Sequence, residues 1–536
     1  MRAFAELLDR LSFTAGRNAK LTLVRDYLRA APDPDRGWAL AALTGALSFD
    51  AAKPAMIRKA VEARMDPVLF AWSYDYVGDL AETVALVWPD PPDGAAVRAD
   101  PSLDSVVQAL RQAGRGEVAR LIEAWLDALD ATGRWALLKL LTGGLRVGVS
   151  ARLAKQACAE LGGVAVEQVE EVWHGLAPPY PALFAWLEGQ APAPDAAAPG
   201  RFRPVILAQA IDEAADFTRL TPADYAAEWK WDGIRVQAVS EGGVRRLFSR
   251  TGDDISAAFP DVVAALDFEG AIDGELLVML DGRAAPFGDL QQRLNRKTVD
   301  AKLLAALPAG VRAYDLLAQE GEDLRAFPFI ERRRRLETFV ARHASPRLDL
   351  SPLQPFQDWA DLARLRADPP PGEARIAEGV MLKRWDSLYE AGRPKGPWFK
   401  WKRDPHLIDA VLMYAQRGHG KRSSYYSDFT FGVWRGEALT PVGKSYFGFT
   451  DAELLLLDKY VRDHTEGRFG PVRAVRADRE AGLVLEIAFE GLQRSTRHKS
   501  GVAMRFPRIH RIRWDKPAAE ADELATLERM LMAQAG

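Results

Sequence analysis

A run of prolines and small residues, QAPAPDAAAPG from Gln190 to Gly200, divides the chain into two parts of different character. This composition is typical of a semi-extended linker, because it offers no apolar face to bury. At 536 residues the chain is also too long for a single hydrophobic core. We therefore predict two to four domains, with one boundary at this linker.

The two sides of the linker differ in their periodicity. Before it, apolar residues recur at helical spacing, as they do from Val118 to Leu129. After it, short alternating or β-rich runs are separated by Gly, Pro and Asp. From Ile408 onward, the spacing of the runs favours a five-stranded barrel of the oligonucleotide-binding type.

Composition narrows the class of protein. Cys158 is the only cysteine, which excludes a disulfide framework and a zinc site built from several cysteines. The N-terminus has charged residues among its apolar ones, and no apolar stretch approaches the roughly 18 residues that span a bilayer. We therefore expect a cytoplasmic protein with no membrane partner.

Basic residues cluster locally although the net charge is −3. From Arg494 to Lys516 there are eight Arg or Lys residues against one acid, Asp515, and aromatic residues lie among them. This pattern favours a surface that neutralises phosphates and packs on sugars or bases, and a solvated face is the alternative. The four arginines from 332 to 335 predict a helix with a basic face.

One lysine has the surroundings of a nucleophile, in the run EWKWDGIR that begins at Glu228. Strand alternation places Glu228, Lys230 and Asp232 on one face and the two tryptophans on the other. A lysine beside buried aromatic rings can keep some free amine. Gly233 permits a tight reversal, and Arg235 then offers a fork for phosphate oxygens. For so short a pattern, an exposed strand and turn is the alternative.

Further motifs follow in order along the chain. They are KWDGIR with Lys230, LFSRTGDD with Arg250, IDGELLV with Glu275, VRAYDLL with Tyr314, EGVMLK with Glu378 and Lys383, and WFKWK with Trp398, Lys400 and Lys402. In this order they resemble the motifs of the nucleotidyltransferase superfamily of DNA ligases, RNA ligases and mRNA capping enzymes. The resemblance implies that residues 201–403 form an adenylation domain of antiparallel sheets and helices.

The resemblance also implies a set of functional residues. Lys230 would be the catalytic residue that receives AMP from ATP. The residues expected to contact the nucleotide are Glu228, Arg235, Arg250, Glu275, Tyr314, Lys383, Arg393, Lys400 and Lys402. Arg393 is assigned because Pro394 occupies the position, six residues before Lys400, where relatives commonly carry an arginine; Lys395 is the alternative.

Several of these residues also have a physical argument of their own. Glu275 and Glu378 lie in apolar strands, where a lone carboxylate is costly. We expect them to hold Mg²⁺ or Mn²⁺, and a hydrogen bond to a sugar hydroxyl is the alternative. Lys400 and Lys402 share a strand face, which is unfavourable unless phosphate lies between them. Tyr314 is expected to stack on adenine, although an aromatic residue in a strand is more often part of a core.

The two ends of the chain resemble DNA ligases in particular. RFPRIHRIRWDK, residues 505–516, resembles the last ligase motif, and alternation puts Arg511, Arg513 and Asp515 on one face. LRVGVS, residues 145–150, resembles a loop that lies against the minor groove in three-domain ATP-dependent DNA ligases. The residues expected to bind DNA or to orient adenylation are Arg146, Gly148, Arg505, Arg508, Arg511 and Lys516.

Taken together, these features predict a multidomain α and α+β protein. The helical DNA-binding domain would span 1–200 with the linker at 190–200, the adenylation domain 201–403, and the oligonucleotide-binding barrel 404–536. We expect an ATP-dependent DNA ligase that seals 3′-hydroxyl/5′-phosphate nicks in duplex DNA through lysyl-AMP and DNA-adenylate, in DNA repair or replication. It would act as a nucleoid-associated monomer, with repair helicases or nucleases as candidate partners.

Two alternatives remain open at this point. An RNA-joining ligase or a guanylyltransferase would carry the same core motifs. A non-catalytic DNA-binding scaffold would carry a lysine motif that no longer reacts with a nucleotide.

Overall fold

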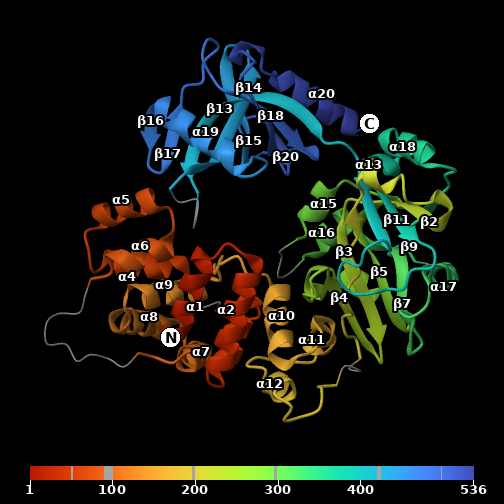
Figure 1. The fold of residues 1–536 in the computed structure, drawn as a ribbon, viewed down its shortest axis with the longest axis horizontal. Helices are drawn as coiled ribbons and strands as arrows, with labels where there is room; N and C mark the ends of the chain where they lie inside the picture. The colour runs from red at the N-terminus through yellow and green to blue at the C-terminus, as the bar shows by residue number, and fades with distance from the viewer. Residues whose placement is uncertain are drawn as a thin grey trace.

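The structure, a computed structural model, describes residues 1–49, 52–89, 100–195, 199–294, 299–343, 345–418, 424–496 and 498–535. Residues 196–198 of the linker and Arg497 of the basic run from Arg494 to Lys516 lie outside the described part. Figure 1 shows three groups of elements around the centre of the view: helices in red and orange, a mixed group in yellow to green, and strands with two helices in blue.

As far as Leu187, all regular secondary structure of the described residues is helical. The helices are α1 (Arg2–Phe13), α2 (Arg17–Ala30), α3 (Asp35–Leu43), α4 (Pro54–Glu62), α5 (Pro67–Val77), α6 (Leu80–Val87), α7 (Leu103–Gln112), α8 (Arg115–Ala128), α9 (Ala131–Thr142), α10 (Ala151–Gly162), α11 (Val166–Trp173) and α12 (Pro181–Leu187). Their buried apolar residues form one core cluster that runs from Met1 to Leu187 and includes no residue from beyond the linker. The predicted helical pattern is confirmed in α8, where Val118, Ile122 and Leu126 are buried.

The ends of α9 and α10 follow from local sequence. The Asp130 side chain accepts a hydrogen bond from the backbone N–H of Gly133 at 2.8 Å, and Gly143 ends α9 with φ 69°. The Ser150 hydroxyl accepts from the N–H of Leu153 at 3.2 Å and so begins α10. An oxygen at the N-cap satisfies a free N–H, and glycine adopts positive φ without strain. These caps fix the ends of the LRVGVS loop.

Two sheets follow the linker. The elements are β1 (Gln209–Ala210), α13 (Glu213–Asp216), β2 (Tyr225–Trp229), β3 (Ile234–Glu241), β4 (Val244–Ser249), α14 (Pro260–Ala264), β5 (Gly270–Leu280), β6 (Arg283–Ala284), α15 (Phe287–Gln291), α16 (Ala301–Ala306), β7 (Ala309–Gln319), β8 (Glu322–Asp323), α17 (Phe329–Arg342), β9 (Leu348–Leu350), β10 (Leu353–Gln354), α18 (Trp359–Ala367), β11 (Gly379–Arg384) and β12 (Trp398–Lys402). One sheet has the order β1-β12-β11-β2-β10, and the other has the order β4-β3-β5-β7-β8. The chain passes from the first sheet to the second between β2 and β3, where Lys230 lies.

A third sheet, a separate two-stranded sheet and two helices form the blue group of Figure 1. The elements are β13 (His406–Arg417), β14 (Tyr426–Arg435), β15 (Ala438–Ser445), α19 (Asp451–Asp463), β16 (Thr465–Phe469), β17 (Val472–Val475), β18 (Val484–Phe489), β19 (Gly491–Arg494), β20 (Val502–Arg505), β21 (Arg508–Arg513) and α20 (Leu524–Ala535). The order β15-β14-β13-β17-β16 is antiparallel, β18 pairs with β13 and β21, and β19 pairs with β20. Its apolar side chains form a core of their own.

The predicted basic face of the arginine run in α17 is wrong. Arg332 is fully buried, and its Nε donates to Asp315 at 2.8 Å. Arg333 is also buried, between Glu228 and Glu337, while Arg334 and Arg335 both pair with Glu331. A guanidinium can be buried when carboxylates satisfy its donors, so these arginines hold α17 in place.

Candidate active site

Lys230 lies at a fixed point in the connection from β2 to β3. Its backbone N–H donates to the carbonyl of Gly379 at 2.9 Å, and the N–H of Glu378 donates to the carbonyl of Lys230 at 2.7 Å. Its ammonium pairs with the Glu378 carboxylate, and the two side chains are 23% and 16% exposed. The lysine is therefore held by its backbone, while its amine remains accessible to a ligand.

The predicted alternation around Lys230 is confirmed. Trp229 and Trp231 pack together with Phe399 and Trp401 in one buried cluster. Gly233 lies in the connection to β3, and its φ is not positive. A Cβ at Gly233 would lie 2.4 Å from the carbonyl oxygen of Leu276, so glycine allows this segment to approach β5 closely.

Three carboxylates influence one another around Lys230. Burial raises the pKa of Glu275 to about 8; Lys230 and Arg235 oppose the shift, and Glu378 and Asp232 add to it. Burial also raises the pKa of Asp232, although Arg505 opposes it. Burial alone would raise the pKa of Glu378, but Lys230 and Lys402 hold it below its usual value. The described residues contain no group of three or more His, Cys, Asp or Glu side chains arranged to hold a metal ion by themselves.

Several cations of the motif residues lie within electrostatic range of Lys400. Lys400, Arg250 and Arg393 make no ion pair within the part of the chain that the structure describes. Burial lowers the pKa of Lys400, and Arg393, Lys230, Lys402 and Arg250 lower it further. Like charges this close repel one another, so the cluster is suited to an anion with several charges.

Lys383 and Glu228 lie deeper and form a closed pair. Each side chain is 2% exposed, and the Nζ–Oε1 distance is 3.2 Å. The Lys383 amine also donates to the carbonyl of Tyr314 at 2.9 Å and lies over the rings of Tyr314 and Trp398. Burial raises the pKa of Glu228 and lowers the pKa of Lys383, and their mutual attraction opposes both shifts. The Tyr314 ring is half-buried beside this pair.

Arg235 does not present the free fork that the sequence suggested. Its Nε and Nη2 donate to the buried Asp273 carboxylate at 3.0 and 2.6 Å, and Nη1 donates to the carbonyl of Ile206 at 2.6 Å. The Tyr389 hydroxyl also donates to Asp273, at 2.5 Å. Neither Asp273 nor Tyr389 was predicted as a site residue from the sequence. An acid in the apolar run IDGELLV was the signal that pointed to the first.

The C-terminal segment reaches the lysine motif through part of its arginines. Arg505 pairs with Asp232, and its guanidinium lies 4.5 Å from the centre of the Phe287 ring. Arg508 pairs with Glu490 at 2.9 Å, and Glu490 lies 3.5 Å from the amine of Lys402. These contacts join the third sheet to the first two on the side of Lys230.

The other basic residues of this segment are held by acids of their own sheet. Arg511 and Arg513 both approach Glu486, at 3.2 and 3.7 Å, which confirms that they share a face. Lys516 pairs with Asp409 of β13 at 2.7 Å. These residues therefore do not reach the lysine motif in this conformation.

Arg146 and Gly148 lie in the loop between α9 and α10. Both are exposed, with φ of 45° and 68°. The Lys20 amine donates to the carbonyl of Val147 at 2.5 Å, and a Cβ at Gly148 would lie 2.3 Å from that amine. The loop thus has a defined conformation that leaves Arg146 exposed, with no ion pair to the described residues.

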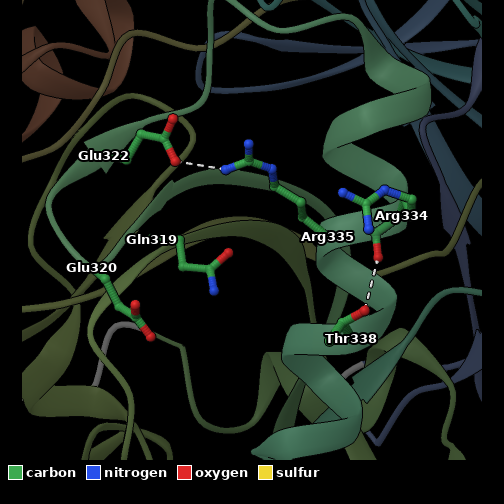
Figure 2. A pocket seen from close by; sticks show the side chains of 6 residues that line it. All are labelled: Gln319, Glu320, Glu322, Arg334, Arg335 and Thr338. Carbon is green, nitrogen blue, oxygen red and sulfur yellow. Dashed lines mark hydrogen bonds and ion pairs between the residues drawn. The ribbon is translucent and has the colours of Figure 1, made fainter.

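A pocket of about 390 Å³ lies elsewhere, between α17 and the β7–β8 turn (Figure 2). Glu322 pairs with Arg335 across it at 2.6 Å, and the Thr338 hydroxyl donates to the carbonyl of Arg334. None of the motif residues lines this pocket, so it is separate from the Lys230 site.

Comparison with known proteins agrees with this geometry. Residues 205–402 match the family model of the ATP dependent DNA ligase domain, and residues 422–516 match the ATP dependent DNA ligase C terminal region. A probable DNA ligase of Koribacter versatilis is 30% identical, in an alignment that covers 100% of this chain and 97% of the relative. DNA ligase 1 of Korarchaeum cryptofilum is 29% identical over 99% of this chain and 97% of the relative.

The fold is similar to that of a solved structure named Pmar-Lig_Pre, with a TM-score of 0.58 and 16% identity over 96% of this chain and 99% of that chain. No helix among the described residues is both long and apolar enough to cross a membrane. The family match includes the segments that carry Lys230 and its charged neighbours, and the relatives align from one end of the chain to the other. The chain is therefore an enzyme of the ATP-dependent DNA ligase family.

Proposed function

We propose that this ligase seals nicks in duplex DNA through a covalent AMP on the Nζ of Lys230. The observation that carries the proposal is the arrangement at that amine. A held but accessible lysine faces Glu378 and lies among cations, Lys400, Arg250 and Arg393, that have no ion-pair partner in the described chain. A triphosphate supplies the negative charge that such a cluster lacks.

In the first step, the lone pair of the Lys230 amine attacks the α-phosphorus of ATP, and the bond to pyrophosphate breaks. The amine must first release a proton to solvent, which its partial exposure allows, and the ion pair with Glu378 holds the side chain in place. Positioning and charge neutralisation dominate phosphoryl transfer, which suits a site made chiefly of lysines and arginines. AMP then passes to a DNA 5′-phosphate, and the 3′-hydroxyl displaces it.

Glu275 and Glu378 fit a divalent cation. Glu275 is buried near two other carboxylates and has a raised pKa, which marks a position where positive charge is lacking. Mg²⁺ is usually bound by one or two carboxylates together with waters and substrate phosphates, so a pair is sufficient. When bound, the ion neutralises phosphate charge.

The domain arrangement that we propose is helical DNA binding by 1–200, adenylation by 201–403, and an oligonucleotide-binding barrel at 404–536. The separate apolar clusters before the linker and in the third sheet support it. The outward Arg146 and the adjoining Gly148 support a DNA contact by the α9–α10 loop. The contact of Arg505 with Asp232 supports a first step in which the third sheet closes over the nucleotide.

The proposal is tested by incubating the protein with ATP or GTP labelled at the α-phosphate. We expect a labelled adduct with ATP that is lost when nicked DNA is added, as joined product appears. Preference for GTP, or transfer only to RNA ends, would replace the proposal with a capping or RNA-joining activity. Failure to form any adduct would leave only binding to DNA.

A further inference from the structure

The helical part of the chain touches the mixed part through α10, α11 and the residue that follows α11. We call this surface the α10–α11 contact and define it by Arg152, Glu171 and His174. Glu171 pairs with Arg201 at 2.9 Å and also with Arg325, both beyond the linker. The other two residues meet loops that lead into the nucleotide site.

His174 packs against the turn that follows Arg250. Its ring lies 5.1 Å from that of Phe202 and 5.3 Å from that of Phe248, measured between ring centres. A Cβ at Gly252 would lie 2.7 Å from the Nε2 of His174, and Gly252 has φ 87°. The turn therefore fits the imidazole closely and accepts only glycine without strain. Arg250 comes two residues before this glycine.

Arg152 meets the residue before Arg393 in the same way. Its guanidinium is held by Glu167 at 2.9 Å and by Glu170 at 2.7 Å. A Cβ at Gly392 would lie 3.3 Å from its Nη2, and Gly392 has φ 90°. The backbone of Gly392 is fixed on the other side by hydrogen bonds with Val205 and Leu207.

Two of the unpaired cations at Lys230 thus lie on loops whose backbones are covered by the helical part. Arg250 and Arg393 both repel Lys400, so without an anion these side chains would move apart unless their loops were held. Within the described chain neither arginine has an ion-pair partner that could hold it. Packing against the loop backbones is then the means by which the cations stay together.

We propose that the α10–α11 contact positions Arg250 and Arg393 for the phosphates of ATP, with His174 and Arg152 as positioning residues. This rests on the proposed function. It assigns to the helical part a role in the nucleotide step as well as in DNA binding. Small displacements of groups that bind a ligand weaken its binding, so the effect is measurable as a raised KM although neither residue touches the nucleotide.

The experiment uses the full-length chain and measures formation of the labelled AMP adduct over a range of ATP concentrations. His174→Ala is expected to raise the KM for ATP about tenfold and Arg152→Ala about threefold, with the rate at saturating ATP unchanged. Joining of a nick that already carries 5′-AMP needs no ATP, so both variants should perform it at the wild-type rate. Gln156→Ala is the matched control, because Gln156 lies on α10 but bonds to Arg17 within the helical part.

The outcomes separate this inference from the proposed function. Absence of an adduct in the wild-type protein would refute the proposed function itself. A wild-type adduct with unchanged ATP KM in both variants would refute only the positioning role. Equal losses on ATP and on the pre-adenylated nick would also refute it, since a contact that only maintains structure or DNA binding affects both steps. If His174→Ala does not fold, Arg152→Ala, whose side chain is 38% exposed, decides the question.

Discussion

Two lysine–glutamate pairs lie along the same β2–β11 ladder, in different surroundings. The exposed pair, Lys230 and Glu378, is 23% and 16% exposed, while both members of the buried pair, Lys383 and Glu228, are 2% exposed. The buried lysine also has a carbonyl and three aromatic rings as neighbours, so its amine is enclosed. Both pairs consist of a lysine and a glutamate, so burial and not residue type decides their roles. An accessible pair can bind a ligand, whereas an enclosed pair stabilises the fold.

The largest expected effect comes from removing the exposed lysine. Lys230→Ala should abolish the protein–AMP adduct, because no other amine occupies its place. The free energy of unfolding should change by less than about 1 kcal/mol, as is usual for partly exposed pairs. Adduct gels and urea denaturation test both halves, and an adduct at the wild-type yield would remove Lys230 from its role.

Lys383→Met should instead act on stability. The substitution removes the lysine charge, so the buried Glu228 carboxylate keeps the ion pair with Arg333 but loses the one with Lys383. We expect this loss to lower the free energy of unfolding by about 3–5 kcal/mol. The double variant Glu228→Gln with Lys383→Met removes both charges and should regain part of that loss. Urea denaturation measures both. If Lys383→Met and Lys230→Met cost the same, the contrast between the two pairs does not hold.

His174 is a third case in which burial decides the charge of a side chain, because burial keeps its imidazole neutral. Burial lowers its pKa to about 4 from the usual 6.5, and Lys155 and Arg246 lower it while Asp253 and Asp254 raise it. Between pH 6.5 and 4 the unfolded chain therefore binds the proton that the folded chain excludes. Stability should fall as pH falls through this window, by up to about 3 kcal/mol from this group.

Urea denaturation at pH 7 and pH 4.5 tests the role of His174, with His174→Gln as the comparison. The variant cannot take up the proton, so the difference in stability between the two pH values should be smaller than in the wild type. An identical difference in both proteins would mean that His174 titrates normally.

The smallest effect is expected in the C-terminal segment, where the same contrast recurs between Arg508 and Lys516. Arg508 reaches Lys402 through Glu490, whereas Lys516 is held by Asp409. Arg508→Ala should slow adduct formation about tenfold, which corresponds to about 1.4 kcal/mol, and Lys516→Ala by less than about threefold. Single-turnover adenylation measures both. Equal slowing would show that distance from the lysine motif does not matter.

Much of the site could be predicted because its residues lie in strands with a two-residue period. Alternation alone places Lys230 opposite Trp229 and Trp231, and Lys400 opposite Trp401, and the buried clusters agree. The helices before Leu187 could be predicted equally well, because apolar spacing and capping residues depend only on residues close by in the sequence. The sequence could not predict which arginines are buried in ion pairs and which are exposed. The run in α17 was expected to be a basic face, yet Arg332 is fully buried against Asp315.

The sequence by itself therefore determined the family, the order of the motifs, the helical and stranded parts, and the lysine that we propose as the nucleophile, because all of these depend on near neighbours. Only the tertiary structure decided which charges are paired. Arg235 is held by Asp273, Lys516 by Asp409, and Arg505 by Asp232, whereas Lys400, Arg250 and Arg393 have no such partner in the described chain. Pairs like these join residues 38 to 273 positions apart. Their formation depends on how whole sheets pack, which no local pattern encodes.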